Sequence, residues 1–145
     1  MKANSGFTLI EVMIVIVIIS ILAAIAVPNY IEYLTKGRIT EAVSALSSMQ
    51  VRMQQHFLDE RTYVGACTAS SVAPLPANTS NFTFACSGLG AAAYQVDATG
   101  QGSMAGFQYR INMLTASGKS TVALPSGWTL PAPSTCFVLN KAGGC

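Results

Sequence analysis

Four cysteines are the residues of this sequence best suited to covalent chemistry, and they lie at positions 67, 86, 136 and 145. An even number of cysteines in a small domain is typical of disulfide bonds formed in an oxidising compartment. Four cysteines allow three pairings, and their order along the chain favours Cys67–Cys86 and Cys136–Cys145. Metal binding is not expected, because no two cysteines have C-x-x-C spacing and His56 is the only histidine.

The remaining polar residues do not form a recognisable catalytic motif. A single histidine without an acidic or thiol partner at useful spacing gives no Ser-His-Asp or Cys-His arrangement. The glycine-rich stretch GQGSMAG lacks the Lys-Ser/Thr ending of a phosphate-binding loop. The scattered carboxylates are expected to face solvent: Glu32, Glu41, Asp59, Glu60 and Asp97. We therefore expect a protein without cofactor, metal or enzymatic activity.

One further carboxylate, Glu11, lies in an apolar run from Phe7 to Val27, where only Thr8 and Ser20 are otherwise polar. As a helix, this run would be about 31 Å long, close to the thickness of a bilayer core. A carboxylate at the middle of a membrane costs about 3 kcal/mol, and less near its surface. The position of Glu11 therefore needs an explanation.

Three interpretations of the run compete. A secretory signal peptide would use Lys2 and the Ala-Ile-Ala cleavage sequence at 24–26, but it would carry Glu11 in its apolar region. A plain membrane anchor explains the length and leaves the carboxylate unexplained. A cleavage and assembly signal, cut between Gly6 and Phe7, accounts for every residue.

The third interpretation is also a resemblance. The sequence GFTLIE at 6–11, followed by a long apolar segment with Pro28, resembles the prepilin signal of type IV pilins and type II secretion pseudopilins. The stretch RITEA, the run YVGAC at 63–67 and the C-terminal cysteine pair make the layout most similar to PilE-type minor pilins. The resemblance implies the pilin fold, in which a long N-terminal helix packs on an antiparallel sheet.

The resemblance also implies roles for individual residues. Residues 1–6 would be a leader that a prepilin peptidase removes, leaving Phe7 as an N-methylated terminus. Glu11 would pair with the Phe7 amine of the same or a neighbouring subunit, and Pro28 also belongs to the pilin pattern. The chain would lie in the bacterial inner membrane first and then polymerise, alone or with other pilins, into an extracellular filament.

The elements that must carry these residues can be predicted from periodicity. Beyond Pro28, where a kink is expected, apolar residues recur at steps of three and four, which predicts one helix over 7–58. They are Ile39, Ala42, Val43, Leu46, Met49, Met53 and Phe57. His56 is expected at the surface or edge of this helix. Residues 59–81, rich in Pro, Ser and Thr, predict a long loop tethered by Cys67.

Alternating apolar residues predict strands at 81–86, 94–98, 107–113 and 120–124, with a further strand starting at Cys136. In the third, Phe107, Tyr109, Ile111 and Met113 should share the buried face. The predicted fold class is α+β, an antiparallel sheet of about four strands covered by the amphipathic half of the helix. The predicted division is a leader at 1–6, an apolar helix at 7–28 and the globular part at 29–145.

The function that these features favour is structural: a pilus subunit serving adhesion, twitching motility or DNA uptake. A type II secretion pseudopilin is the first alternative. The second is a pilus-associated binding subunit, an adhesin or DNA receptor, with Arg110, Lys119 and Lys141 as candidate contacts. A net charge of +2 and three scattered cations give little support for nucleic-acid binding.

Overall fold

The computed structural model describes residues 7–145. The predicted leader and the Gly6 side of the predicted cleavage site lie outside these residues. The chain forms two compact units, one ending at Thr35 and the other running from Lys36 to Cys145. The predicted boundary at 28/29 marks the end of the uniformly apolar run and stays a prediction.

Helix α1 runs from Leu9 to Glu60 without interruption and contains Pro28. This confirms the single long helix expected from the sequence. The residue after the helix, Arg61, takes a left-handed conformation with φ 56° and donates its N–H to the Phe57 carbonyl at 2.9 Å. Such a left-handed residue after the last turn is a common helix stop.

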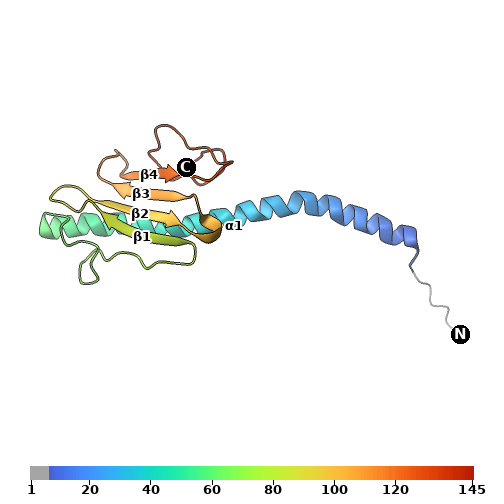
Figure 1. Cartoon of the computed structure of the whole chain (residues 1–145), viewed down its shortest axis with the longest axis horizontal. Coiled ribbons are helices and arrows are strands. Elements are labelled where there is room, and N and C mark those ends of the chain that lie inside the picture. The colour runs from blue at the N-terminus through green and yellow to red at the C-terminus, as the bar shows by residue number, and fades with distance from the viewer. Residues whose placement is uncertain (1–6) are drawn as a thin grey trace. The chain divides into compact units, whose positions relative to one another are not determined.

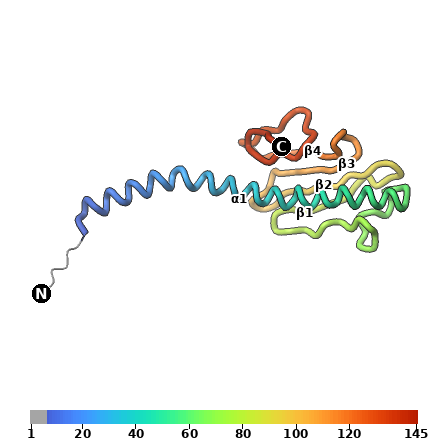
Figure 2. Tube along the Cα trace, turned by 180° about the vertical axis from the view of Figure 1, so that it is seen from behind, coloured from blue at the N-terminus to red at the C-terminus, as the bar shows by residue number. Residues whose placement is uncertain are grey.

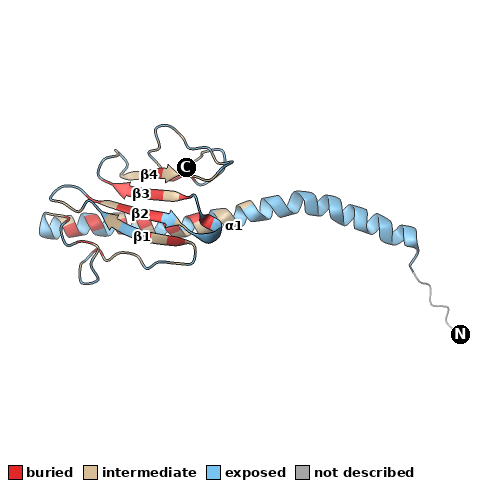
Figure 3. Cartoon of the chain, in the orientation of Figure 1, coloured by how far each residue is buried: buried red, intermediate tan, exposed pale blue. Residues whose placement is uncertain are grey.

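Up to Ile31, every described residue is exposed within the structure (Figure 3). Residues 12–19 are rich in Ile and Val, which are poor helix formers in water. In an apolar medium the helix is nevertheless favoured, because it satisfies every backbone N–H and C=O within one segment. The composition of this segment is therefore suited to lipid or to other apolar helices.

The sheet has four antiparallel strands in sequence order, β1 (Phe82–Ser87), β2 (Gln95–Gly100), β3 (Gln108–Asn112) and β4 (Lys119–Ala123) (Figure 1). A short 3-10 helix, η1 (Gly102–Met104), connects β2 to β3. The register shifts between Gln108 and Tyr109 where β3 pairs with β4. The α+β fold with a four-stranded meander, predicted from the sequence, is confirmed.

The part of α1 after Lys36 lies along one face of the sheet (Figure 2). Its buried residues follow helical spacing: Ile39, Ala42, Leu46, Met49, Met53 and His56. The sheet, together with Tyr94 just before β2, supplies alternating residues to the same core: Phe82, Phe84, Tyr94, Val96, Ala98, Tyr109 and Ile111. Helix period and strand period thus meet in one apolar layer.

Three details differ from the prediction. His56, expected at the surface or edge, is 6% exposed and belongs to the buried stripe, while Val43 and Phe57 are only partly buried. Met113, expected in the core, is exposed, and Asn112 is buried instead. The reason is local: β3 ends at Asn112, whose Oδ1 accepts the N–H groups of Leu114 and Thr115 and so starts a turn.

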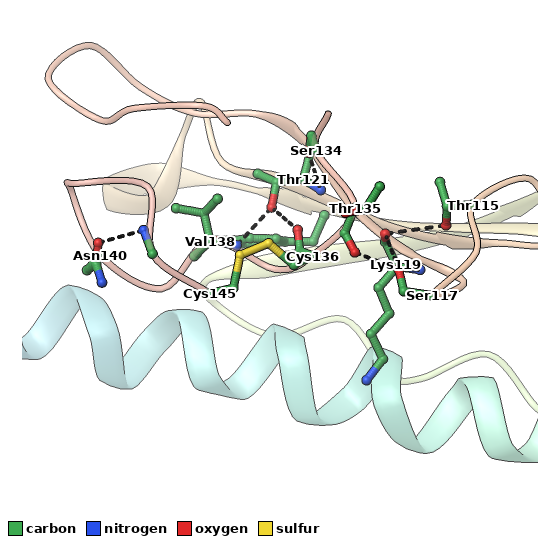
Figure 4. Close-up of a disulfide and its surroundings, with 12 residues drawn as sticks. Thr115, Ser117, Lys119, Thr121, Ser134, Thr135, Cys136, Val138, Asn140 and Cys145 are labelled. Carbon is green, nitrogen blue, oxygen red and sulfur yellow. Dashed lines mark hydrogen bonds between the residues drawn. A yellow bond between two sulfur atoms is a disulfide. The ribbon is translucent and has the colours of Figure 1, made fainter. Parts of the chain in front are cut away.

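The strand predicted from Cys136 is the third difference, because residues 136–139 are not a strand. This segment instead contacts β4 through a side chain (Figure 4). Thr121 Oγ1 donates to the Cys136 carbonyl at 2.8 Å and accepts the Val138 N–H at 2.9 Å. Since the hydroxyl stands in for backbone ladder bonds, Val138 is fully buried without belonging to the sheet.

Candidate assembly and binding surfaces

Glu11 lies in the first turn of α1 and takes part in its cap. The Glu11 N–H donates to Thr8 Oγ1 at 3.3 Å, and the Val12 N–H donates to the Thr8 carbonyl at 3.3 Å. Thr8 is therefore the N-cap, and Glu11 stands three residues later, as in a capping box. A carboxylate here is also favoured by the helix dipole. The sequence analysis missed this cap, although the T-x-x-E spacing could have revealed it.

Phe7 and Glu11 line one shallow apolar groove on the surface of the helix. The groove has a volume of about 280 Å³, and Val12, Val15 and Ile16 complete its lining. Phe7 itself is 85% exposed. The structure therefore places two of the predicted assembly residues in the lining of one groove, Phe7 just before the N-cap Thr8 and Glu11 in the first turn of the helix.

Two hydroxyl groups in the N-terminal part of α1 are satisfied within the helix. Ser20 Oγ donates to the Ile16 carbonyl at 2.7 Å, and Thr35 Oγ1 donates to the Ile31 carbonyl at 2.9 Å. Pro28 has no N–H, so the carbonyl of Ala24 lacks its usual helical donor. By length and composition, α1 could cross a membrane. Glu11 is thus the one charged group among the described residues before Glu32.

The three candidate cations for ligand binding do not form one patch. Arg110 Nε forms an ion pair with Asp97 Oδ1 at 2.6 Å, and Gln95 Nε2 donates to the other oxygen of that carboxylate at 2.7 Å. Lys119 pairs with Ile111 in the sheet and therefore faces the helix side, where its Nζ lies 5.7 Å from the centre of the Phe137 ring. Arg110, next to Ile111 in β3, faces the opposite side.

Two polar residues of α1 form hydrogen bonds with η1 and with the loop before β1. Arg38 donates to Ser103 Oγ at 2.8 Å, and Glu41 accepts from Asn81 Nδ2 at 2.9 Å. Hydrogen bonds from Thr79 and Asn81 lower the pKa of Glu41 below its usual value. The sequence analysis expected Glu41 simply to face solvent, and no sequence signal identified its partners forty residues away.

Two disulfides are present among the described residues, Cys67–Cys86 and Cys136–Cys145. The first joins the long loop after α1 to strand β1, and the second closes the C-terminal segment (Figure 4). Among residues 7–145, no group of three or more His, Cys, Asp and Glu side chains could hold a metal ion.

Comparison with known proteins divides the chain into two matched stretches. Residues 1–27 match a family described as prokaryotic N-terminal methylation motif. Residues 28–115 match a family described as type IV minor pilin ComP, DNA uptake sequence receptor. The second match covers α1 from Pro28 and the sheet up to β3, and it stops before β4 and the C-terminal disulfide.

Individual relatives match a little under half of the chain. A fimbrial protein of Pseudomonas aeruginosa is 46% identical over 68 residues, which are 47% of this chain and 44% of the relative. The type IV major fimbrial protein FimA of Dichelobacter nodosus is 39% identical over 71 residues, 49% of this chain and 41% of that protein. The type IV major pilin protein PilA of Myxococcus xanthus is 39% identical over 71 residues, which are 49% of this chain and 32% of that protein.

These alignments span less than half the length of each relative. The minor-pilin match, in contrast, extends over more than half of this chain and includes most of the sheet. A methylation motif, a capped apolar helix with an early carboxylate and a meander packed on the second half of that helix occur here together. The chain belongs to the type IV pilins, in the family described as type IV minor pilin ComP, DNA uptake sequence receptor.

Proposed function

We propose that this chain is a structural subunit of a type IV pilus that polymerises through the apolar half of α1. The observation that carries the proposal is the continuous exposed surface from Phe7 to Ile31, interrupted by a single charge. Soluble monomers do not leave apolar surfaces of this extent in water. Lipid can cover it before assembly, and the helices of neighbouring subunits can cover it afterwards.

Glu11 would set the register between subunits. Cleavage between Gly6 and Phe7 would create a charged amine at Phe7, which lines the same groove as Glu11. An unpaired charge is costly in an apolar filament core, so the carboxylate needs a partner there. The Phe7 amine of the same or a neighbouring subunit supplies one. Pro28, the third proposed assembly residue, is where the helix lacks a backbone bond and can bend.

Capping offers a different role for Glu11, and two substitutions separate the two roles. Glu11→Gln retains a residue that suits a capping box but removes the charge, whereas Glu11→Val removes both. If charge pairing drives assembly, both variants should reach the membrane at normal levels and enter filaments poorly. The measurement is the amount of the chain in sheared surface filaments, by quantitative mass spectrometry, relative to its amount in the membrane.

Glu60→Val serves as the matched control, because Glu60 is an exposed carboxylate at the other end of α1. It should enter filaments normally. Normal incorporation of Glu11→Gln would contradict the charge-pairing role and leave the capping role. Equal incorporation of all variants would remove Glu11 from the assembly mechanism altogether.

The same proposal includes the route to the filament. A prepilin peptidase would remove residues 1–6, Phe7 would be methylated, and the protein would reside in the inner membrane before it joins a filament of this or other pilins. A type II secretion pseudopilin would share these steps. Surface filaments that contain the chain support the pilin, whereas loss of secretion without filaments on deletion supports the pseudopilin.

DNA binding is a second candidate function, favoured by the family match over residues 28–115. Two of the cations predicted as DNA contacts give this function little support. Arg110 forms an ion pair with Asp97, and Lys119 faces the helix side of the sheet. Filter binding of duplex DNA with a salt titration tests this function. Binding whose affinity falls steeply with salt would support it, since each phosphate contact adds about 0.9 to the slope of log K against log salt.

A further inference from the structure

An open groove lies at one end of the globular unit, between α1 and the β3–β4 connection. Its volume is about 420 Å³. Gln50 and Gln54 of α1 form one wall, and most of the β3–β4 connection from Asn112 to Gly118 forms the other, with Tyr94 between them in the lining. Pockets of this size commonly bind small molecules through a few well-placed amides and hydroxyls.

Two almost fully buried side chains in this groove keep hydrogen-bonding groups unused. Tyr94 is 3% exposed and Asn112 is 6% exposed. No hydrogen bond joins the Tyr94 hydroxyl or Asn112 Nδ2 to another group within residues 7–145, yet neither atom is enclosed as His56 Nε2 is. Both atoms are therefore accessible to solvent. Tyr94 and Asn112 both line the groove, so these two unpaired groups can form hydrogen bonds with a ligand that enters it.

The groove is also held in shape. The ring of Tyr94 packs against that of Tyr63 at 4.7 Å between centres, and Tyr63 stacks on Phe57 at 4.9 Å. Gln50 Nε2 donates to the Ser117 carbonyl at 3.3 Å, which fixes the opposite wall. Gly118 has φ +67°, and a side chain there would collide with the Gln50 amide. A preorganised wall loses little conformational entropy on binding.

The lining determines the chemical class of the ligand. No Lys, Arg, Asp or Glu is among the residues that line the groove, and the nearby Lys119 directs its ammonium to the Phe137 ring instead. Burial, with a smaller contribution from Tyr63, raises the pKa of Tyr94 to about 12, so its hydroxyl is protonated and can both donate and accept. The Gln54 side-chain amide can likewise both donate and accept hydrogen bonds.

We propose that this groove binds a neutral saccharide unit of a glycan. Vicinal sugar hydroxyls both donate and accept, which matches the amide and phenol groups that stand open here. A nucleic acid would need cations for its phosphates, and none lines the groove. The groove does not include residues of the apolar half of α1. Sugar binding can therefore be tested independently of the proposed role in filament assembly.

The test uses the full chain with ¹⁵N-labelled Asn and Gln, in micelles of a phosphocholine detergent because that detergent carries no sugar. Methyl glycosides of glucose, galactose, mannose and N-acetylglucosamine are titrated to millimolar concentrations. At least one should shift the side-chain amide resonances of Gln50, Gln54 and Asn112. Tyr94→Phe, which removes only the hydroxyl, should weaken binding about fivefold to tenfold. Gln54→Ala should do the same, and its exposed helix neighbour Gln55→Ala should bind normally.

Three results would overturn the proposal. The first is the absence of any shift with all four neutral glycosides. The second is a shift that Tyr94→Phe and Gln54→Ala leave unchanged, because the sugar would then bind elsewhere. The third is a response of the same amides to methyl glucuronide or to a single-stranded oligonucleotide without a response to any neutral glycoside, which would assign the groove to a charged ligand.

Discussion

His56 is buried on the same face of α1 as Met49 and Met53, and its Nε2 has no hydrogen-bond partner among the residues that the structure describes. An unsatisfied buried polar atom costs about 1–3 kcal/mol. We expect His56→Leu, which is similar in size and apolar, to raise the free energy of unfolding by about 1 kcal/mol. Urea unfolding of the full chain in micelles measures this through Trp128, which packs edge-on against Phe107.

The exposed neighbour Gln55→Leu is the control and should leave stability nearly unchanged. A clear loss of stability in His56→Leu would contradict the prediction and show that the imidazole has a favourable partner in the folded protein.

Glu41 should make stability depend on pH. Its pKa is lowered in the folded state by hydrogen bonds from Thr79 and Asn81, so the ionised form is the one that stabilises the fold. This contribution is present above the usual pKa of about 4.5 and is lost as the pH falls through it towards the lower folded value. We expect the free energy of unfolding of Glu41→Gln to decrease less between pH 6 and pH 3 than that of the wild type.

The measurement is the urea midpoint at each pH, with Glu60→Gln as the control because Glu60 is exposed at the end of the helix. Parallel pH profiles for the wild type and Glu41→Gln would show that this carboxylate contributes nothing to the acid response.

At the residue scale, sequence reasoning was strongest where neighbours in the chain decide the outcome. The buried positions Ile39, Leu46 and Met53 follow from helical spacing alone. The Thr8 N-cap could have been predicted from the T-x-x-E spacing of Thr8 and Glu11. The burial of His56 and the partners of Glu41 could not, because they depend on where distant loops fold against the helix.

At the scale of elements, Thr121 in β4 holds the C-terminal segment in place of a fifth strand. Its hydroxyl bonds both the Cys136 carbonyl and the Val138 N–H. Thr121→Val keeps the shape but leaves the buried Val138 N–H and the partly buried Cys136 carbonyl unpaired, so we expect a loss of about 1–3 kcal/mol. Hydrogen exchange of the Val138 amide should accelerate while amides of β2 stay protected.

Ser120→Val in the same strand is the matched control, since no side-chain bond from Ser120 holds this segment. Unchanged protection of Val138 in Thr121→Val would mean that the disulfide and Tyr109, which donates to the Val138 carbonyl at 2.9 Å, suffice to hold the segment.

The strands themselves were predictable because one buried face imposes alternation, as Val96 and Ala98 in β2 illustrate. The segment 136–139 shows the same apolar character and was wrongly predicted as a strand. Periodicity reports that residues are buried; it does not report whether backbone ladders or a side chain satisfy their N–H groups. The groove that Tyr94 lines could not be predicted from the sequence either. Its two walls, α1 and the β3–β4 connection, are far apart in the chain and meet only after folding.

At the scale of the whole molecule, the sequence describes two environments in one helix. Before Ile31 the residues are apolar on all sides, whereas beyond Lys36 only one face is buried. The first pattern is suited to lipid or to other helices, and the second to the sheet of the same chain. The long helix and the class of fold were therefore predictable, whereas whatever covers the first half of the helix would have to come from outside this chain.

Removal of the leader would prepare the apolar half of the helix for assembly. Cleavage between Gly6 and Phe7 would leave the Thr8 cap and the whole of α1 intact, because the helix begins at Leu9. The intact mass of the protein extracted from membranes should lack residues 1–6 and carry one added methyl group. A signal-peptide cut before Val27 would instead delete the apolar half of the helix, including Glu11. A mature terminus at Val27 would therefore contradict both the cleavage site and the proposed assembly surface.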